Sequence, residues 1–341
     1  MTTSLTKTPC TSTRLDDCVD LYLIDSQGLL GPARLENAKE LGFRGVVNWP
    51  GPAMDAAADI IHELGMVYYV MAPSWPGLRD RIPEEWAFKT AQGHSSLARD
   101  GRNYQPSFWV QDPALDTMVR GHLEEALAKA DGVILTTSQC ESRMPCQWPH
   151  GTIEQILGYW CHDEYSLAAW KEQINGDRPP ASDARHKDLV TLRWCQTALV
   201  NRLDWMVGIA SEFTDTIWIM VPSWFPLDDP LYWAVGLYRL DEMLHPLVAK
   251  IQSQYNGRVL IPALFHSAAP CAEHAAGLIA NHGWKIVAGA EVAPGQPWRA
   301  NLAKNGPRAR DMGLSGMIMD DSSVANPDHR AEVEELLCRF M

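Results

Sequence analysis

The chain has 341 residues, of which 46% are hydrophobic and 21% charged, and its formal net charge is −13. A chain of this length and hydrophobic content can bury a sizeable core. Its acidity, with no cluster of Lys and Arg interleaved with aromatic residues, argues against nucleic acid as a partner.

Short apolar runs alternate with helical patterns along the chain, and a run of four to eight residues bounded by Gly or Pro is typical of a buried parallel strand. We predict eight strands, at residues 21–24, 43–47, 66–71, 133–137, 217–221, 259–264, 286–290 and 316–319. Helices are predicted at residues 34–41, 54–64, 113–130, 164–174, 186–213, 231–255, 272–281 and 330–340, with a short basic helix before the last strand.

This regular alternation predicts an α/β fold, a (β/α)8 TIM barrel built as a single domain. Residues 19–341 would form the barrel, after a polar extension at residues 1–18. The extension lacks the apolar segment of a secretory signal, and no apolar run reaches the length of a membrane span. The eight cysteines show no C-x-x-C pair and no zinc spacing. We therefore expect a cytoplasmic protein with reduced thiols, no metal and no cofactor, and we make no prediction of its oligomeric state.

Two glutamates lie near the ends of strands on opposite sides of the predicted barrel. Glu291 directly follows the seventh apolar run, and Glu141 follows the fourth after a short polar segment. Barrel enzymes keep their catalytic groups at the carboxyl-terminal ends of the strands. Two carboxyl groups facing each other across such a mouth can flank one glycosidic bond.

The stretch around Glu291 carries further landmarks in order: Pro294-Gly295, Trp298, Gly306-Pro307, and a glycine-containing entry to the eighth strand. It resembles the family 42 glycoside hydrolases, the β-galactosidase-like members of the retaining barrel clan A. The resemblance extends upstream to residues 72–76, 99–102, 111–114 and 165–171. It implies a carbohydrate substrate and a retaining mechanism, with Glu141 as acid/base and Glu291 as nucleophile.

The chain also departs from this family. Cys140 stands where the family has an Asn that bonds a sugar hydroxyl, and the clustered zinc-binding cysteines after the fourth strand are absent. The eighth strand ends on Asp320-Asp321 instead of an aromatic-rich segment, and no accessory domains follow the barrel. These departures leave the sugar open.

Other side chains near the strand ends complete the predicted site. Fourteen Trp are many for this length, and sugar sites use Trp rings as stacking platforms. The predicted substrate-binding residues are Trp49, Trp75, Arg143, His150, Asp163, Trp224, His266, Trp298 and Asp320.

Two alternative functions stay open. A non-catalytic carbohydrate-binding barrel would tolerate Cys140 and the missing domains. A metal-dependent TIM-barrel hydrolase or lyase would need a His-x-His after the first strand or carboxylates at successive strand ends, and the second, third and fifth strands end on Trp or Asn.

Overall fold

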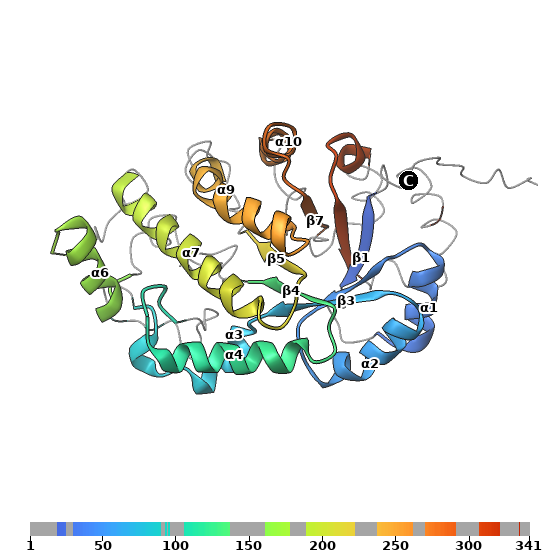
Figure 1. Ribbon diagram of the computed structural model, residues 1–341, viewed down its shortest axis with the longest axis horizontal. Helices are drawn as coiled ribbons and strands as arrows, with labels where there is room; N and C mark the ends of the chain where they lie inside the picture. Colours follow the sequence, from blue (N-terminus) through green and yellow to red (C-terminus); the bar gives the residue numbers. More distant parts are fainter. Residues whose placement is uncertain are drawn as a thin grey trace, which may run out of the picture.

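The computed structural model describes residues 19–24, 30–89, 93, 95, 106–136, 161–177, 189–221, 237–261, 270–290, 307–320 and 334. Within these residues, eight parallel strands form one closed barrel in sequential order, and β8 pairs with β1 to close it (Figure 1). The predicted (β/α)8 TIM barrel is therefore confirmed. The predicted extension at residues 1–18, and the last predicted helix apart from residue 334, lie outside the described residues.

The strands begin and end close to the predicted positions because each coincides with an apolar run. They are β1 (Asp20–Ile24), β2 (Gly45–Asn48), β3 (Val67–Ala72), β4 (Gly132–Leu135), β5 (Ile217–Met220), β6 (Val259–Ile261), β7 (Ile286–Ala290) and β8 (Gly316–Asp320). Strands buried on both faces read as continuous apolar sequence, which is why the runs do not alternate with polar residues.

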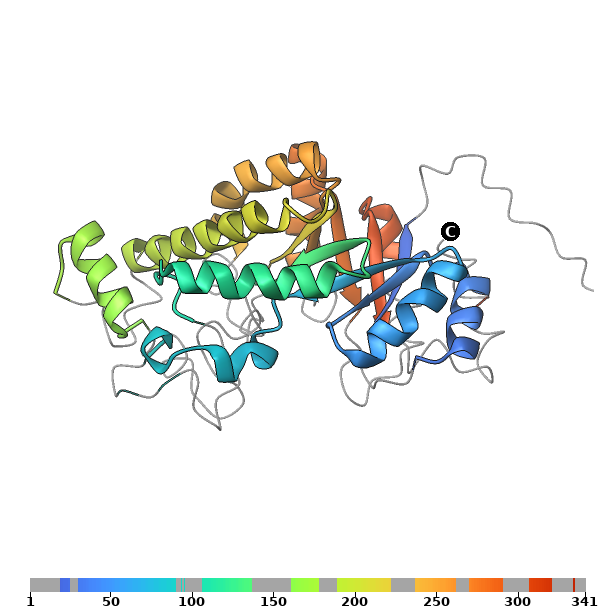
Figure 2. The same ribbon diagram turned by 60° about the horizontal axis from the view of Figure 1, so that its bottom comes forward.

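Helices surround the barrel on its outside (Figures 1 and 2). They are α1 (Pro32–Glu40), α2 (Pro52–Glu63), α4 (Pro113–Leu127), α6 (Glu164–Ile174), α7 (Leu189–Ala210), α9 (Leu237–Gln254) and α10 (Pro270–His282), and residues 307–311 are also helical. None of the described helices combines the length and apolarity that crossing a membrane requires.

Helix ends follow the local signals in the sequence. The Asp112 carboxylate accepts a hydrogen bond from the Ala114 backbone N–H at 2.8 Å, and Pro113 occupies the first turn of α4, where a missing N–H costs nothing. Helix α2 ends before Gly65, whose φ of +65° suits glycine far better than residues with a Cβ.

The segment between β3 and α4 differs from its prediction as a long polar loop. It contains the short helix α3 (Trp75–Leu78) and the 3-10 turns η2 (Arg79–Arg81) and η3 (Glu84–Trp86). Single helical turns of this length are too short to show an apolar periodicity in the sequence, so the pattern gave no signal for them.

The barrel interior is filled by side chains that alternate along the strands. Tyr22, Tyr69 and Trp218, from β1, β3 and β5, bring their rings together with centroid separations of 4.6–5.7 Å. Glycines begin three of the even strands, β2, β4 and β8: a Cβ would lie 2.3 Å from the Val67 carbonyl oxygen at Gly45, 2.7 Å from the Thr216 carbonyl oxygen at Gly132, and 3.2 Å from the Tyr22 ring at Gly316. Small residues on even strands thus leave space for large rings on odd strands.

A second layer of packing stands outside the barrel, where the β3–α4 segment, α6 and the first half of α7 meet. Trp109 and Trp194 stack with centroids 3.9 Å apart, and Trp170 meets Trp194 edge-on at 5.0 Å. Figures 1 and 2 show α6 beyond α7, at the end of the molecule away from β1.

We predict that Gly45→Ala destabilises the fold by about 1–3 kcal/mol, because its Cβ would collide with backbone that is fixed in the β2–β3 ladder. Gly208 in α7 is the matched control, since it is exposed and a Cβ there meets nothing within 4 Å. Gly208→Ala should stabilise by about 0.5–1 kcal/mol. Urea denaturation of both variants measures the difference, and equal effects would contradict the packing described.

Candidate functional site

The carboxyl-terminal ends of all eight strands lie on one rim, because the strands are parallel and the barrel is closed. Glu291 directly follows Ala290, the last residue of β7, and Glu141 follows β4 after the buried Thr136. Both glutamates lie outside the described residues, as do Arg143, His150, Trp224, His266 and Trp298. Their roles stay predictions.

Trp49 lies at this rim. It follows Asn48, the last residue of β2, and it is half-buried against the cluster of side chains that fills the barrel interior. Its backbone N–H donates to the Asn48 side-chain oxygen at 2.8 Å, which fixes the chain where it leaves the strand. Trp49 is therefore partly exposed at the point where the chain leaves β2.

Asp320 is the last residue of β8, and its backbone pairs in register with Ile24 of β1. This position places it at the same rim as the end of β2, because β1 lies between β8 and β2. A substrate-binding role for Asp320 stays a prediction.

Trp75 has a different environment from the one its position after β3 suggested. It begins α3, it is 2% exposed, and it belongs to the hydrophobic core between the barrel and the outer helices. In this structure its ring face is enclosed by protein, so it is not open to a sugar.

Asp163 likewise has a local structural role. It is 1% exposed and caps α6, accepting hydrogen bonds from the Ser166 backbone N–H at 2.9 Å and the Ser166 hydroxyl at 2.5 Å. Burial raises the pKa of its carboxyl, and the hydrogen bonds from Ser166 partly oppose that rise. Helix α6 lies beyond α7, away from β1 (Figures 1 and 2), and a substrate-binding role for Asp163 stays a prediction.

The turn after β3 is held by polar contacts that the sequence did not reveal. The Ser74 backbone N–H donates to Nε2 of His122 at 3.0 Å, and the Thr136 hydroxyl donates to the Pro73 carbonyl oxygen at 3.3 Å. Burial lowers the pKa of His122, which favours the neutral ring that can accept this hydrogen bond. These contacts couple β3, β4 and α4 beneath the rim.

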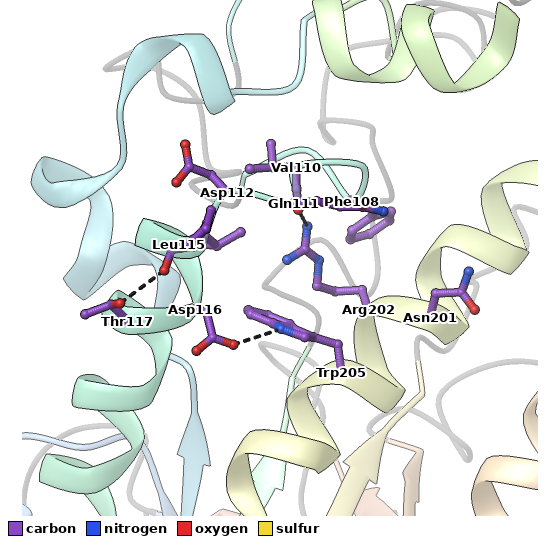
Figure 3. A pocket seen from close by; sticks show the side chains of 11 residues that line it. Phe108, Val110, Gln111, Asp112, Leu115, Asp116, Thr117, Asn201, Arg202 and Trp205 are labelled. Carbon is purple, nitrogen blue, oxygen red and sulfur yellow. Dashed lines mark hydrogen bonds between the residues drawn. The ribbon is translucent and has the colours of Figure 1, made fainter. Parts of the chain in front are cut away.

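A pocket of about 570 Å³ lies beside the barrel, between the residues that precede α4 and the middle of α7 (Figure 3). Arg202 reaches into it from α7 and donates from Nη2 to the carbonyl oxygens of Ser107 and Val110, at 2.9 and 3.0 Å. The guanidinium lies over the Trp205 ring, 4.7 Å from its centroid. No motif in the sequence indicates this pocket, because its residues come from segments far apart in the chain.

Among the residues that the structure describes, no group of three His, Cys, Asp or Glu side chains is arranged to hold a metal ion. The described part of the rim includes the amide of Asn48 and the partly exposed ring of Trp49, and these groups suit hydrogen bonding and stacking.

No protein-family model matches the chain, and no curated protein sequence matches it. Among solved structures, the chain is similar to the β-mannanase of the blue mussel Mytilus edulis, at 9% identity and a TM-score of 0.44, over 90% of this chain and 83% of that one. It is also similar to the thiamine phosphate pyrophosphorylase of Pyrococcus furiosus, at 11% identity and a TM-score of 0.37, over 96% of this chain and 98% of that one. The similarity to the HpcH/HpaI aldolase of Desulfitobacterium hafniense has 11% identity and a TM-score of 0.38, over 89% of this chain and 86% of that one. Similarities this weak assign neither a family nor an activity.

We predict that Trp75→Ala mainly lowers stability, whereas Trp49→Ala mainly weakens ligand binding. Trp75→Ala should cost about 3–5 kcal/mol of stability, because it empties a closed part of the core. Trp49→Ala should cost less stability and should weaken binding of whatever ligand enters the barrel, because the side chain is only partly buried where β2 ends. Denaturation midpoints and ligand affinity, measured on both variants, test this. The assignment fails if Trp75→Ala leaves stability unchanged.

The cap at Asp163 predicts a pH dependence. The pKa of the Asp163 carboxyl is higher in the folded state than in the unfolded chain, so the folded protein binds this proton more tightly. Wild type therefore loses stability as pH rises from about 4 through the folded-state pKa. Asn keeps an acceptor for the Ser166 N–H and does not ionise. Asp163→Asn should therefore gain stability relative to wild type over this range.

Urea denaturation at several pH values measures the difference in unfolding free energy between Asp163→Asn and wild type. The exposed Asp177 is the matched control, and Asp177→Asn should show no comparable change with pH. If the stability advantage of Asp163→Asn over wild type became smaller as pH rises, the result would contradict a buried Asp163 cap.

Proposed function

We propose that the chain is a retaining glycoside hydrolase acting on a β-linked glycoside or oligosaccharide. The proposal is carried by one observation: the closed parallel barrel brings the carboxyl-terminal ends of β4 and β7 to one rim, and a glutamate follows each in the sequence. The resemblance of residues 285–321 to family 42 supports the assignment of Glu291 as nucleophile and Glu141 as acid/base.

The reaction is a double displacement. The Glu291 carboxylate attacks the anomeric carbon while the protonated Glu141 donates its proton to the leaving oxygen, so an ester bond forms as the glycosidic bond breaks. Glu141, now a carboxylate, then takes a proton from water, which hydrolyses the ester and restores the original configuration. Retaining enzymes hold the two carboxyl groups roughly 5–5.5 Å apart.

The environment of Trp49 is the support that comes from the described residues. A half-buried indole next to the buried amide of Asn48 offers a flat apolar face and a polar group at one strand end. Sugars present the same combination of an apolar ring face and peripheral hydroxyls. The remaining binding candidates, Arg143, His150, Trp224, His266 and Trp298, stay part of the proposal on sequence position alone.

Two alternatives predict different results in one experiment. A non-catalytic carbohydrate-binding barrel would bind sugars without releasing an aryl leaving group. A metal-dependent hydrolase or lyase would lose its activity in EDTA, whereas the proposed mechanism needs no metal. Release of the aryl group from a panel of aryl β-glycosides, assayed with and without EDTA, distinguishes all three.

We predict that Glu291→Gln abolishes turnover with every leaving group, because no other group in the mechanism can form the ester. Glu141→Gln should lower the rate by about 10²–10⁴-fold with a poor leaving group and much less with an activated aryl one. Added azide should rescue Glu141→Gln and give a glycosyl azide of retained configuration, because azide attacks the intermediate without a general base.

The exposed Glu63, the last residue of α2, provides a control, since α2 ends on the side of the barrel where β3 begins and Glu63→Gln should leave the rate unchanged. Wild type should show a bell-shaped pH profile of kcat/KM, whose limbs belong to the carboxyl pair. Inversion of configuration by wild type would eliminate the double displacement. Azide rescue with retention in Glu291→Gln instead of Glu141→Gln would exchange the two roles.

A further inference from the structure

Arg202 is buried, and the part of the chain that the structure describes supplies no matching negative charge. It is 6% exposed, yet no carboxylate pairs with its guanidinium among the residues that the structure describes. Its Nη2 atom is occupied by two backbone carbonyls, whereas Nε and Nη1 have no acceptor within that part of the chain. A buried cation that keeps unfilled donors is costly unless an anion accompanies it.

Arg202 lines the pocket between α4 and α7. Figure 3 shows the Arg202 side chain extending from α7 towards the loop before α4, with Trp205 and Asp116 beside it. The apolar side chains of Phe108, Val110 and Leu115 line the same pocket, so its wall combines one cation with an apolar surface. Its volume of about 570 Å³ is in the range of small-molecule sites.

The two carboxylates of the pocket do not neutralise Arg202, because each already has other partners. Asp112 caps α4 through the Ala114 N–H. Asp116 accepts hydrogen bonds from Arg120 and from the Trp205 indole at 3.3 Å, and its side chain is 39% exposed. Both acids are partly exposed lining residues, and their negative charges disfavour a dianion in the pocket more than a monoanion.

We propose that this pocket binds a small organic carboxylate, whose charged group pairs with Arg202 and whose apolar body lies against Phe108 and Leu115. The site is separate from the barrel mouth and does not depend on the proposed glycosidase activity. A carboxylate accepts charge-assisted hydrogen bonds from a guanidinium, and one negative charge matches one buried Arg. Inorganic phosphate fits less well, because it brings a second charge and no apolar body.

Benzoate is the probe, and benzamide, which has the same shape without the charge, is its matched control. Calorimetric titration of wild type should show benzoate binding at least about tenfold tighter than benzamide, the size of one charge-assisted hydrogen bond. Inorganic phosphate should bind more weakly than benzoate. Equal affinity for benzoate and benzamide, or no binding at millimolar benzoate, would overturn the proposal.

Variants place the binding in this pocket. Arg202→Met should lose benzoate binding, while Arg193→Met, the same change at an exposed position of the same helix, should keep it. If Arg202→Met does not fold, Gln111→Trp serves instead, because Gln111 is exposed, lines the pocket and can be enlarged to fill it. Benzoate affinity that survives in folded Arg202→Met or Gln111→Trp would show that the ligand binds elsewhere.

Discussion

One guanidinium group at the floor of the barrel joins strands that are far apart in the chain. Arg258, just before β6, donates to the Asp20 carboxylate of β1 at 2.7 Å and to the Ser315 carbonyl before β8 at 2.9 Å. It also lies over the rings of Trp218 and Tyr22. A barrel closes only if β1 and β8 meet, and this group spans that junction from inside. The side chains are partly exposed at the floor, at 16% for Arg258 and 20% for Asp20, which limits the cost of desolvating the ion pair.

The same floor explains why glycines begin several strands. Gly45 and Gly316 give room to the neighbouring strands and to the Tyr22 ring, and Gly132 does the same beside the backbone of Thr216. Burial of the Tyr22 ring also raises the pKa of its hydroxyl, so the ring stays neutral beside Asp20. The interior aromatic side chains therefore pack at the amino-terminal end of the barrel. The opposite rim is the end where this fold usually has its catalytic groups.

Helix α7 links the barrel to its outer layer. Its 22 residues span about 33 Å, more than twice the length of a four-residue strand. It packs against β4 and β5, and it also holds the β3–α4 segment, through the stacking of Trp194 on Trp109 and through hydrogen bonds from Arg202 to Ser107 and Val110. The pocket beside Arg202 therefore lies between the β3–α4 segment and the same helix that covers β4 and β5.

The sequence was sufficient for the barrel and much less so for the site, for a physical reason. A buried strand is visible in the local sequence as a short apolar run, so the eight apolar runs predicted every strand. The direction of a side chain after a strand ends depends on packing between distant segments. Trp49 and Trp75 both follow strands, yet one lies at the mouth and the other in the core. Of the Trp residues that the structure describes, Trp86, Trp109, Trp170, Trp194, Trp218 and Trp284 also pack within the protein. An excess of Trp is therefore weak evidence for a sugar site here, and Trp49 and the strand-end glutamates are the stronger evidence for the proposal of one.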